Sequence, residues 1–221
     1  MRQIAIDGPA GAGKSTIAKR VAEELHFVYI DTGAMYRTLA LACLNKQVDI
    51  SDEDLVSRTA EGAQLDIQYM DGVQHMFLDG EDVSRLIRTE QVSKAASDTS
   101  KYQRVRTRLV DLQQELAKRY DVVMDGRDIG TVVLPHADLK IFLTASVEVR
   151  ARRRFLEYQE KGIPCDLEAL KEDIAQRDYN DSHRENSPLR RAEDAIEVDS
   201  SDLTIQEVTD VVIHLYRKAV Q

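Results

Sequence analysis

The residues with the most specific chemistry form a run near the start of the chain: Gly8, Pro9, Ala10, Gly11, Ala12, Gly13, Lys14 and Ser15, followed by Thr16. The run fits the pattern G-x-x-x-x-G-K-[ST] of a P-loop. Its glycines let backbone N–H groups point inward at phosphate oxygens, Lys14 can reach the outer phosphates, and the Ser15 hydroxyl can ligate Mg²⁺. The sequence therefore predicts a site for the phosphates of a nucleoside triphosphate. The alternative is a glycine-rich turn that binds nothing.

The elements around this run are those that a P-loop needs. A short apolar strand is predicted at 3–7 and a helix at 14–25, which gives the strand–loop–helix context. A second Mg²⁺ anchor is predicted at Asp125, which closes an apolar strand at 121–125. The alternative for Asp125 is a carboxylate that only caps the turn after the strand. Ser15 and Asp125 are the predicted metal ligands.

Arginine suits phosphoryl transfer because its planar guanidinium binds phosphate through paired hydrogen bonds. Arg150, Arg153 and Arg154 are spaced i, i+3, i+4, so they share one face of a predicted helix. As a group they are predicted to stabilise the transferring phosphate. The alternative is surface ion pairing, since Glu157 stands four residues after Arg153.

A second helix carries another such face. Arg177, Asp181 and Arg184 are spaced i, i+4, i+7. The carboxylate can accept hydrogen bonds from ribose hydroxyls while an arginine holds a phosphate. A salt-bridge ladder within the helix is the alternative.

Two short segments that follow strands carry side chains suited to bind a nucleotide or phosphate acceptor. Thr32, Tyr36 and Arg37 follow the strand at 27–31, and their hydroxyl, aromatic and guanidinium groups suit a nucleotide or phosphate acceptor. Arg127 and Asp128 follow Asp125 after a single glycine, which allows a tight turn. A plain core role is the alternative for Tyr36.

The elements that must position these residues alternate between strands and helices. Apolar strands are predicted at 3–7, 27–31, 121–125, 139–143 and 195–199. Helices are predicted at 14–25, 33–45, 51–61, 89–100, 102–120, 146–161, 166–184 and 204–218, the third of them opened by a capping box at 51–54. This order predicts an α/β fold with a doubly wound, mostly parallel five-stranded sheet, in which ligands bind beyond the carboxyl ends of the strands.

A small antiparallel β unit interrupts that order between about 63 and 87. Residues alternate with period two at 65–69 and 73–77, and Asp71-Gly72 between them is a strong hairpin signal. Asp79-Gly80 marks a second turn.

The composition limits the classes of protein to which this chain can belong. A chain of 221 residues with 43% hydrophobic and 31% charged residues can bury a sizeable core as a globular protein. Its net charge of −9 argues against binding long nucleic acid, and no apolar run reaches the ~18 residues of a membrane span. The two cysteines suggest neither a disulfide framework nor a metal site, and the P-loop at residue 8 leaves no room for a signal peptide. We expect a cytoplasmic protein without a membrane or nucleic-acid partner, and a monomer.

The whole chain resembles the bacterial cytidylate kinases, a family of nucleoside monophosphate kinases. The P-loop alone indicates only a nucleotide kinase, whereas the other motifs are more specific. The motifs that carry the resemblance are IDGPAGAGKST at 6–16, DTGAMYR at 31–37, GEDVSRLIRTEQVSKAAS at 80–97, RVR at 104–106, DGRDIGTVV at 125–133, QRDYNDSHR at 176–184 and VDS at 198–200. One departure is Thr32, where the family commonly has Ser, but the hydroxyl is kept.

The resemblance implies a P-loop-type fold with three parts in a single domain. These are a core at 1–31, 101–149 and 192–221, a region that binds the nucleoside monophosphate at 32–100, and a helical, arginine-rich lid at 150–191. It also implies ATP as phosphoryl donor together with Mg²⁺.

The resemblance further implies roles for the site residues. Residues 8–16 would hold the ATP phosphates, and Lys14, Arg127, Arg153 and Arg184 are the expected catalytic residues. The expected substrate-binding residues are Thr32, Tyr36, Arg37, Ser97, Arg106, Arg127, Asp128, Arg177, Asp181 and Arg184. Among these, Ser97, Arg106 and Asp128 would read cytosine, and Arg177 and Asp181 would meet the ribose.

The expected reaction is the ATP-dependent phosphorylation of CMP and dCMP. Asp128 can accept from the cytosine N4 amino group while Arg106 donates to N3 or O2, a pattern that uracil does not match. The rival within the same class is a P-loop kinase for UMP, AMP or another small acceptor such as shikimate. A rival from another class is a nucleotide-gated binding module, against which the acceptor-type arginines argue.

Overall fold

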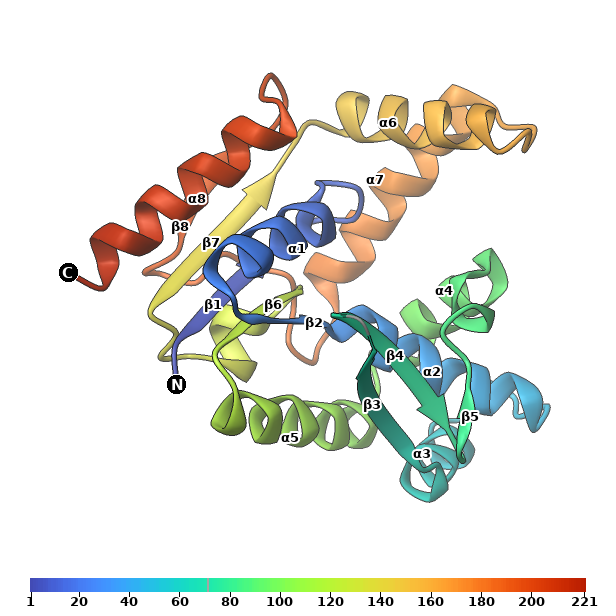
Figure 1. The fold of residues 1–221 in the computed structure, drawn as a ribbon. Helices are drawn as coiled ribbons and strands as arrows, with labels where there is room; N and C mark the ends of the chain where they lie inside the picture. Colours follow the sequence, from blue (N-terminus) through green and yellow to red (C-terminus); the bar gives the residue numbers. More distant parts are fainter. Residues whose placement is uncertain (71) are drawn as a thin grey trace. The chain divides into compact units, whose positions relative to one another are not determined.

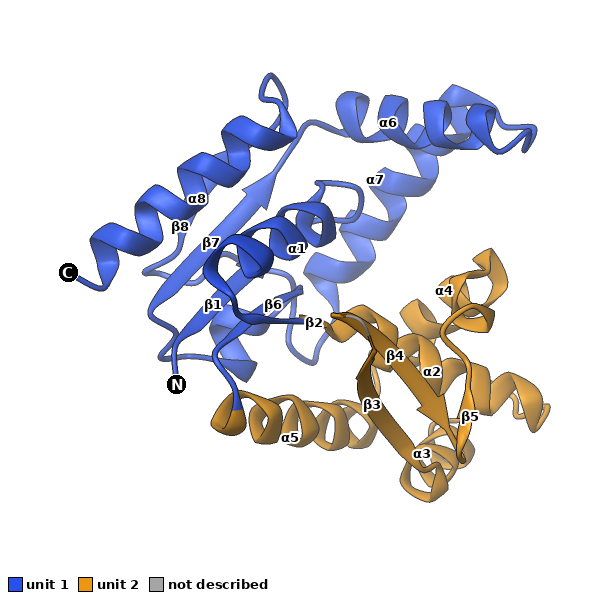
Figure 2. Ribbon diagram, in the orientation of Figure 1, with its two compact units in different colours: residues 1–29, 120–221 blue, residues 30–119 orange. Residues whose placement is uncertain are grey.

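The computed structural model describes residues 1–70 and 72–221. The chain forms two compact units (Figure 2): unit 1 comprises residues 1–29 and 120–221, and unit 2 comprises residues 30–119. Within the described residues, no helix is both long enough and apolar enough to cross a membrane.

A parallel sheet forms the centre of unit 1 (Figure 1). Its strands are β1 (Gln3–Asp7), β6 (Val122–Gly126), β7 (Leu139–Thr144) and β8 (Ile196–Asp199), and β2 (Val28–Asp31) passes from unit 1 into unit 2. The strand order is β2-β6-β1-β7-β8, and β1 pairs in parallel with β6 and β7, as β7 does with β8. The predicted five-stranded parallel sheet is confirmed.

Helices α1 (Lys14–Leu25) and α8 (Ile205–Ala219) build the main core of unit 1 against this sheet. Ile4 and Ile6 of β1 are fully buried, because a central strand is covered on both faces. They pack in one cluster with Val21 of α1 and Val212 of α8. This packing fixes the carboxyl end of β1, from which the P-loop starts.

Two further helices form a hairpin in unit 1. These are α6 (Val147–Glu160) and α7 (Leu167–His183), and they share a small core of their own around Ala151, Leu170 and Ile174. Ser146 and Asp166 cap the two N-termini by accepting backbone N–H groups. A π-helical turn, η2 (Ile129–Val133), follows β6 and was not predicted.

Unit 2 contains helices and a second, antiparallel sheet. Its elements are α2 (Thr32–Asn45), α3 (Glu53–Gly62), β3 (Leu65–Met70), β4 (Val73–Leu78), β5 (Glu81–Asp82), a 3₁₀ turn η1 (Leu86–Arg88), α4 (Glu90–Thr99) and α5 (Gln103–Arg119). The strand order β3-β4-β5 is antiparallel, which confirms the predicted β insertion.

The structure describes only one of the two turns predicted in this insertion in full. Met70 pairs with Val73, so the strands meet on either side of the predicted Asp71-Gly72 turn, of which Asp71 lies outside the described residues. Asp79 and Gly80 form the second turn with φ values of 51° and 90°. Such paired positive φ values are those of a tight hairpin turn.

The predicted capping box at 51–54 is wrong in detail. Asp52 is the N-cap of α3, and its carboxylate accepts the N–H of Leu55. The Ser51 hydroxyl instead donates to Asp49 in the preceding turn. Aspartate and serine both make good N-caps, so their order in the sequence did not decide between them.

Candidate active site

The P-loop starts at the carboxyl end of β1 and enters α1. Gly8, Gly11 and Gly13 have φ values of 149°, 78° and 88°, which side chains rarely tolerate. Space is also limiting at Gly8, where an added Cβ would lie 1.9 Å from the backbone oxygen of Leu143 on β7. The loop therefore leaves β1 in contact with the neighbouring strand, and only glycine fits there.

Replacing Gly8 by alanine is expected to disrupt both folding and catalysis. The new Cβ meets a backbone oxygen that cannot move without displacing β7, so we expect a loss of at least ~2 kcal/mol in the free energy of unfolding. Chemical denaturation measures this loss. Gly62→Ala is the matched control, because Gly62 lies in α3 with no atom within 4 Å of the added Cβ. Equal stability of the Gly8→Ala variant and the wild type would contradict the packing argument.

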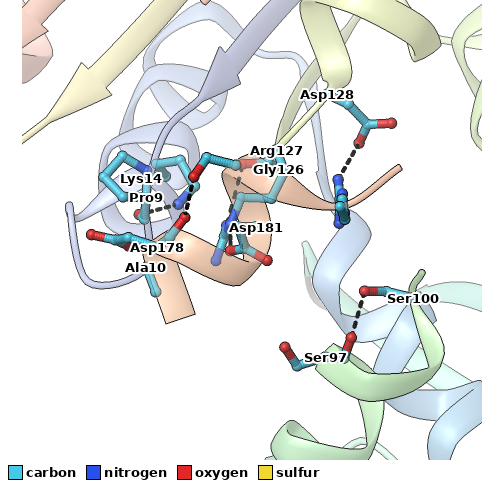
Figure 3. A network of polar contacts seen from close by, with 12 residues as sticks. Pro9, Ala10, Lys14, Ser97, Ser100, Gly126, Arg127, Asp128, Asp178 and Asp181 are labelled. Carbon is cyan, nitrogen blue, oxygen red and sulfur yellow. Dashed lines mark hydrogen bonds and ion pairs between the residues drawn. The ribbon is translucent and has the colours of Figure 1, made fainter. Parts of the chain in front are cut away.

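Lys14 is the first residue of α1, and its ammonium group lies inside the loop. Its Nζ donates to the backbone oxygen of Pro9 at 2.7 Å, a contact drawn in Figure 3. Burial, reinforced by the charge of Arg127, lowers the pKa of Lys14 to about 7, although Asp125, Asp7 and Asp181 oppose the shift. A buried cation with so little solvation is suited to bind an anion strongly.

Ser15 and Asp125, the predicted metal ligands, lie in direct contact. The Ser15 hydroxyl donates to Oδ2 of Asp125 at 2.8 Å. The Tyr29 hydroxyl donates to Oδ1 at 2.7 Å, a contact that the sequence did not reveal. Hydroxyl and carboxylate oxygens are donors that Mg²⁺ prefers, so the chemistry of these two residues fits this ion.

Arg127 and Asp181 form an ion pair next to the P-loop residues (Figure 3), in which Asp181 is buried and Arg127 is partly buried. Arg127 Nε donates to Asp181 Oδ2 at 2.7 Å, so the predicted ribose and phosphate residues contact each other. For Asp181, burial raises the pKa, but the positive charges of Arg127, Arg177 and Arg184 outweigh it and the net pKa is lowered. For Arg127, burial lowers the pKa, but Asp181 outweighs it and the net pKa is raised. Both groups are therefore ionised near neutral pH.

Asp128 and Arg184 lie close to this pair in unit 1. One Nη of Arg184 is 4.0 Å from Oδ1 of Asp128, and the Asp128 side chain is buried. Arg184 Nε donates to the backbone oxygen of Ser187 at 2.6 Å. Of the face predicted at 177–184, Asp181 lies on α7 beside Arg127, whereas Arg184 is the C-cap of α7 with an extended backbone and lies beside Asp128.

The three arginines predicted to share a face of α6 have separate partners. Arg150 is buried and donates to the backbone oxygens of Ala10 and Ala145 and to the carboxylate of Asp178 at 2.6 Å. Arg153 donates to the backbone oxygen of Ser200 at 2.6 Å, not to Glu157. Arg154 contacts the Tyr158 hydroxyl. Arg150 thereby joins the P-loop to α7, and the catalytic role of Arg153 stays a prediction.

Unit 2 gathers predicted acceptor residues around Asp31 at the end of β2. Asp31 accepts the N–H of Ala34 and so caps α2. Its Oδ2 also pairs with Arg37 at 3.0 Å and with Arg88 of η1 at 3.4 Å. Two guanidinium groups therefore converge on one carboxylate, which holds Arg37 at the start of α2. Thr32 is buried at the first position of the same helix.

The predicted cytosine-reading residues of unit 2 also lie near one another. Arg106 is buried, its guanidinium carbon is 5.5 Å from the ring centre of Tyr36, and it donates to the backbone oxygen of Ser100 at 3.0 Å. The Ser100 hydroxyl donates to the backbone oxygen of Ser97, as Figure 3 shows. Tyr36, Arg106 and Ser97 thus come from α2, α5 and α4 but form one polar and aromatic cluster.

Several residues that organise the site were not assigned roles from the sequence. They are Asp7, Tyr29, Asp31, Arg88 and Asp178. Asp7 and Asp31 were visible only as carboxylates that close strands, which is a weak signal. Tyr29, Arg88 and Asp178 act through residues far away in the sequence, so no spacing pattern could have revealed them.

Comparisons with known proteins identify relatives of this chain. The family model for cytidylate kinase matches residues 4–218. The chain is 50% identical over 218 residues to a cytidylate kinase of Lactobacillus johnsonii, covering 99% of this chain and 95% of that protein. It is 53% identical over 218 residues to one of Caldicellulosiruptor bescii, with 99% and 96% covered. It is 54% identical over 212 residues to one of Bacillus cereus (strain B4264), with 96% and 94% covered.

A comparison with solved structures bears on the fold alone. The structure of an uncharacterized protein from Eubacterium ventriosum is 13% identical, covers 98% of both chains and gives a TM-score of 0.53. The family match spans nearly the whole chain, and the relatives share about half of its residues over nearly their full length. The chain therefore belongs to the cytidylate kinase family, as its motifs predicted, and is a nucleoside monophosphate kinase, a phosphotransferase.

Proposed function

We propose that this chain transfers the γ-phosphoryl group of ATP to CMP and dCMP, giving CDP or dCDP and ADP. The observation that carries the proposal is the P-loop of unit 1, whose buried Lys14 lies near the ion pair between buried Asp181 and partly buried Arg127. The family membership supports the choice of acceptor, since the relatives are named cytidylate kinases.

In this proposal an oxygen of the acceptor phosphate attacks the γ-phosphorus in line. The bond between the γ-phosphorus and the bridging oxygen breaks, and ADP leaves with that oxygen. The acceptor oxygen is already anionic at neutral pH, so no side chain has to remove a proton. Positioning and positive charge account for catalysis, as is usual for phosphoryl transfer.

The donor phosphates would lie against the backbone N–H groups of residues 8–16 and the N-terminus of α1. Lys14 would exchange its contact with Pro9 for the outer phosphates. Ser15 and Asp125 would hold Mg²⁺, which when bound neutralises phosphate charge and orients the triphosphate. Tyr29 would keep the Asp125 carboxylate oriented through its hydrogen bond.

The acceptor would be recognised by its phosphate, its sugar and its base. Arg37 and Arg127 would bind its phosphate, and Arg177 and Asp181 its ribose. Thr32 and Tyr36 would line the acceptor site, and Ser97, Arg106 and Asp128 would read cytosine. Residues 150–191 would act as the lid that excludes water, with Arg153 and Arg184 as its phosphate-binding charges. We further propose that the protein acts in the cytoplasm as a monomer.

A coupled assay of ADP release across acceptors tests the proposal. With ATP and Mg²⁺, we expect CMP and dCMP to stimulate ADP release well above the rate without acceptor. UMP, AMP and shikimate should give a much smaller stimulation, because their functional groups do not match the cytosine-reading residues. A rate that no acceptor changes would favour a nucleotide-gated binding module instead.

A further inference from the structure

Asp7, the last residue of β1, is a buried carboxylate to which the proposed transfer assigns no role. Only 5% of this residue is exposed. Its Oδ1 accepts the N–H of Ile129 at 2.8 Å, and its Oδ2 accepts the N–H of Gly130 at 2.7 Å. These two residues directly follow Arg127 and Asp128. One side chain therefore joins the strand end before Gly8 to the loop that carries two proposed acceptor residues.

The local backbone explains why a carboxylate is needed at this point. Ile129 and Gly130 open η2, and the hydrogen bonds of the turn itself start at Val132, whose N–H donates to the Asp128 backbone oxygen at 2.8 Å. The first two N–H groups of the turn thus need an outside acceptor. An ionised carboxylate has two acceptor oxygens and serves both groups, whereas an asparagine amide has only one.

The approach of η2 to β1 is also close. A Cβ added at Gly130 would lie 3.1 Å from Cδ of Lys140 and 3.4 Å from Oδ2 of Asp7. The position of this backbone is therefore set by direct contact with β1 and β7 rather than by the loop alone.

We propose that Asp7 is a positioning residue for phosphoryl transfer. Its two hydrogen bonds hold the Arg127–Asp128 loop at a fixed place relative to the P-loop, so that the acceptor phosphate is aligned with the γ-phosphorus. This inference rests on the proposed function, because it needs Arg127 and Asp128 to bind the acceptor.

The ionised Asp7 carboxylate lowers the free energy of unfolding, because it is buried. That the chain keeps a charge with this cost supports a role in the reaction. Burial raises its pKa from 3.8 to about 6, against the two backbone hydrogen bonds. The charge of Asp128 raises this pKa further, and that of Lys14 lowers it. Lys140 also faces the turn, but its ammonium is held by Asp194 and the Pro135 oxygen. The folded state binds the proton of the Asp7 carboxyl more tightly than the unfolded chain does. The protonated carboxyl therefore adds to the free energy of unfolding below pH 3.8, and this contribution is lost as the pH rises through 6.

The test is the variant Asp7→Asn, measured at pH 8 with ATP, Mg²⁺ and CMP. We expect KM for CMP to rise about tenfold, because one N–H of the loop loses its acceptor, while KM for ATP stays within about twofold. The variant should also unfold at a higher temperature than the wild type, because it removes a buried charge. A residue with a merely structural role would instead lower the unfolding temperature and affect both KM values.

Asp138→Asn is the matched control. Asp138 accepts the N–H of Gln3 at 2.7 Å, at the opposite end of the same strand, and we expect its replacement to leave both KM values unchanged. The ratio of wild-type to Asp7→Asn kcat/KM for CMP should fall from about 10 at pH 8 toward about 1 at pH 5, as the wild-type carboxyl becomes protonated. Titration of the substrate phosphates cancels in this ratio.

Two results would overturn the role of Asp7. One is an unchanged KM for CMP at pH 8 in the Asp7→Asn variant, and the other is a variant that is less stable than the wild type or fails to fold. Wild-type turnover of CMP tests the proposed function separately. If the wild type phosphorylates CMP and Asp7→Asn does so equally well, only the inference about Asp7 fails.

Discussion

Replacement of Lys14 by methionine should lower kcat for CMP phosphorylation by about 10²–10³-fold, the usual effect of removing one preorganised charge from a transition state. Methionine keeps much of the apolar stem but removes the ammonium that lies 2.7 Å from the Pro9 oxygen. That ammonium belongs to the residue directly before Ser15, the predicted Mg²⁺ ligand. Initial rates of CDP formation at saturating ATP and CMP measure the effect.

Stability separates this effect from a folding defect. The pKa of Lys14 is lowered to about 7 mainly by burial, so the folded state binds its proton less tightly than the unfolded chain does. At pH 7 the charge therefore costs stability, and Lys14→Met should unfold at the same temperature as the wild type or higher. Lys118→Ala removes an exposed lysine paired with Glu115 and should change neither property. A normal kcat for Lys14→Met would overturn the assignment of the P-loop.

Replacement of Asp128 by alanine should reduce the preference for CMP over UMP by about 10–100-fold, while KM for ATP changes little. Each unpaired buried polar group costs roughly 1–3 kcal/mol, and cytosine would lose its N4 acceptor in this variant. Asp128 is buried and lies 4.0 Å from Arg184, so its carboxylate is held in place within unit 1. The ratio of kcat/KM for the two acceptors is the measurement.

A carboxylate elsewhere at the sheet end serves as control for Asp128. Asp199 closes β8 and accepts the N–H of Ser201, but it is exposed and belongs to no predicted part of the site. Asp199→Asn should keep the wild-type ratio of CMP to UMP turnover. If Asp128→Ala also keeps that ratio, Asp128 does not read the base.

Much of the fold could be predicted because it is encoded locally. The bounds of β1 and α1 were predicted without error, since an apolar strand, a glycine-rich loop and an amphipathic helix follow one another within 25 residues. The antiparallel insertion was likewise marked by period-two alternation and two turn signals. The N-cap of α3 was predicted at Ser51 rather than at Asp52 because both side chains can cap a helix.

The partners of charged side chains could not be predicted in the same way. The spacing of Arg150, Arg153 and Arg154 placed them on one helix, but their partners come from the P-loop, α7, the segment after β8 and α6 itself. Asp7 illustrates the same limit, because it is 122 residues away from Ile129, whose N–H it accepts. Such contacts depend on tertiary packing, whereas spacing reports only on neighbours along one element.

The most direct test of the account follows the γ-phosphoryl group itself. ATP labelled at the γ-phosphorus is mixed with the enzyme, Mg²⁺ and CMP, and the products are separated after a single turnover. The account predicts that the label appears in CDP, with one CDP formed for each ADP and none of the label attached to the protein. Label recovered as inorganic phosphate or on the protein would contradict it, as would equally ready transfer of the label to UMP in a parallel reaction in which UMP replaces CMP.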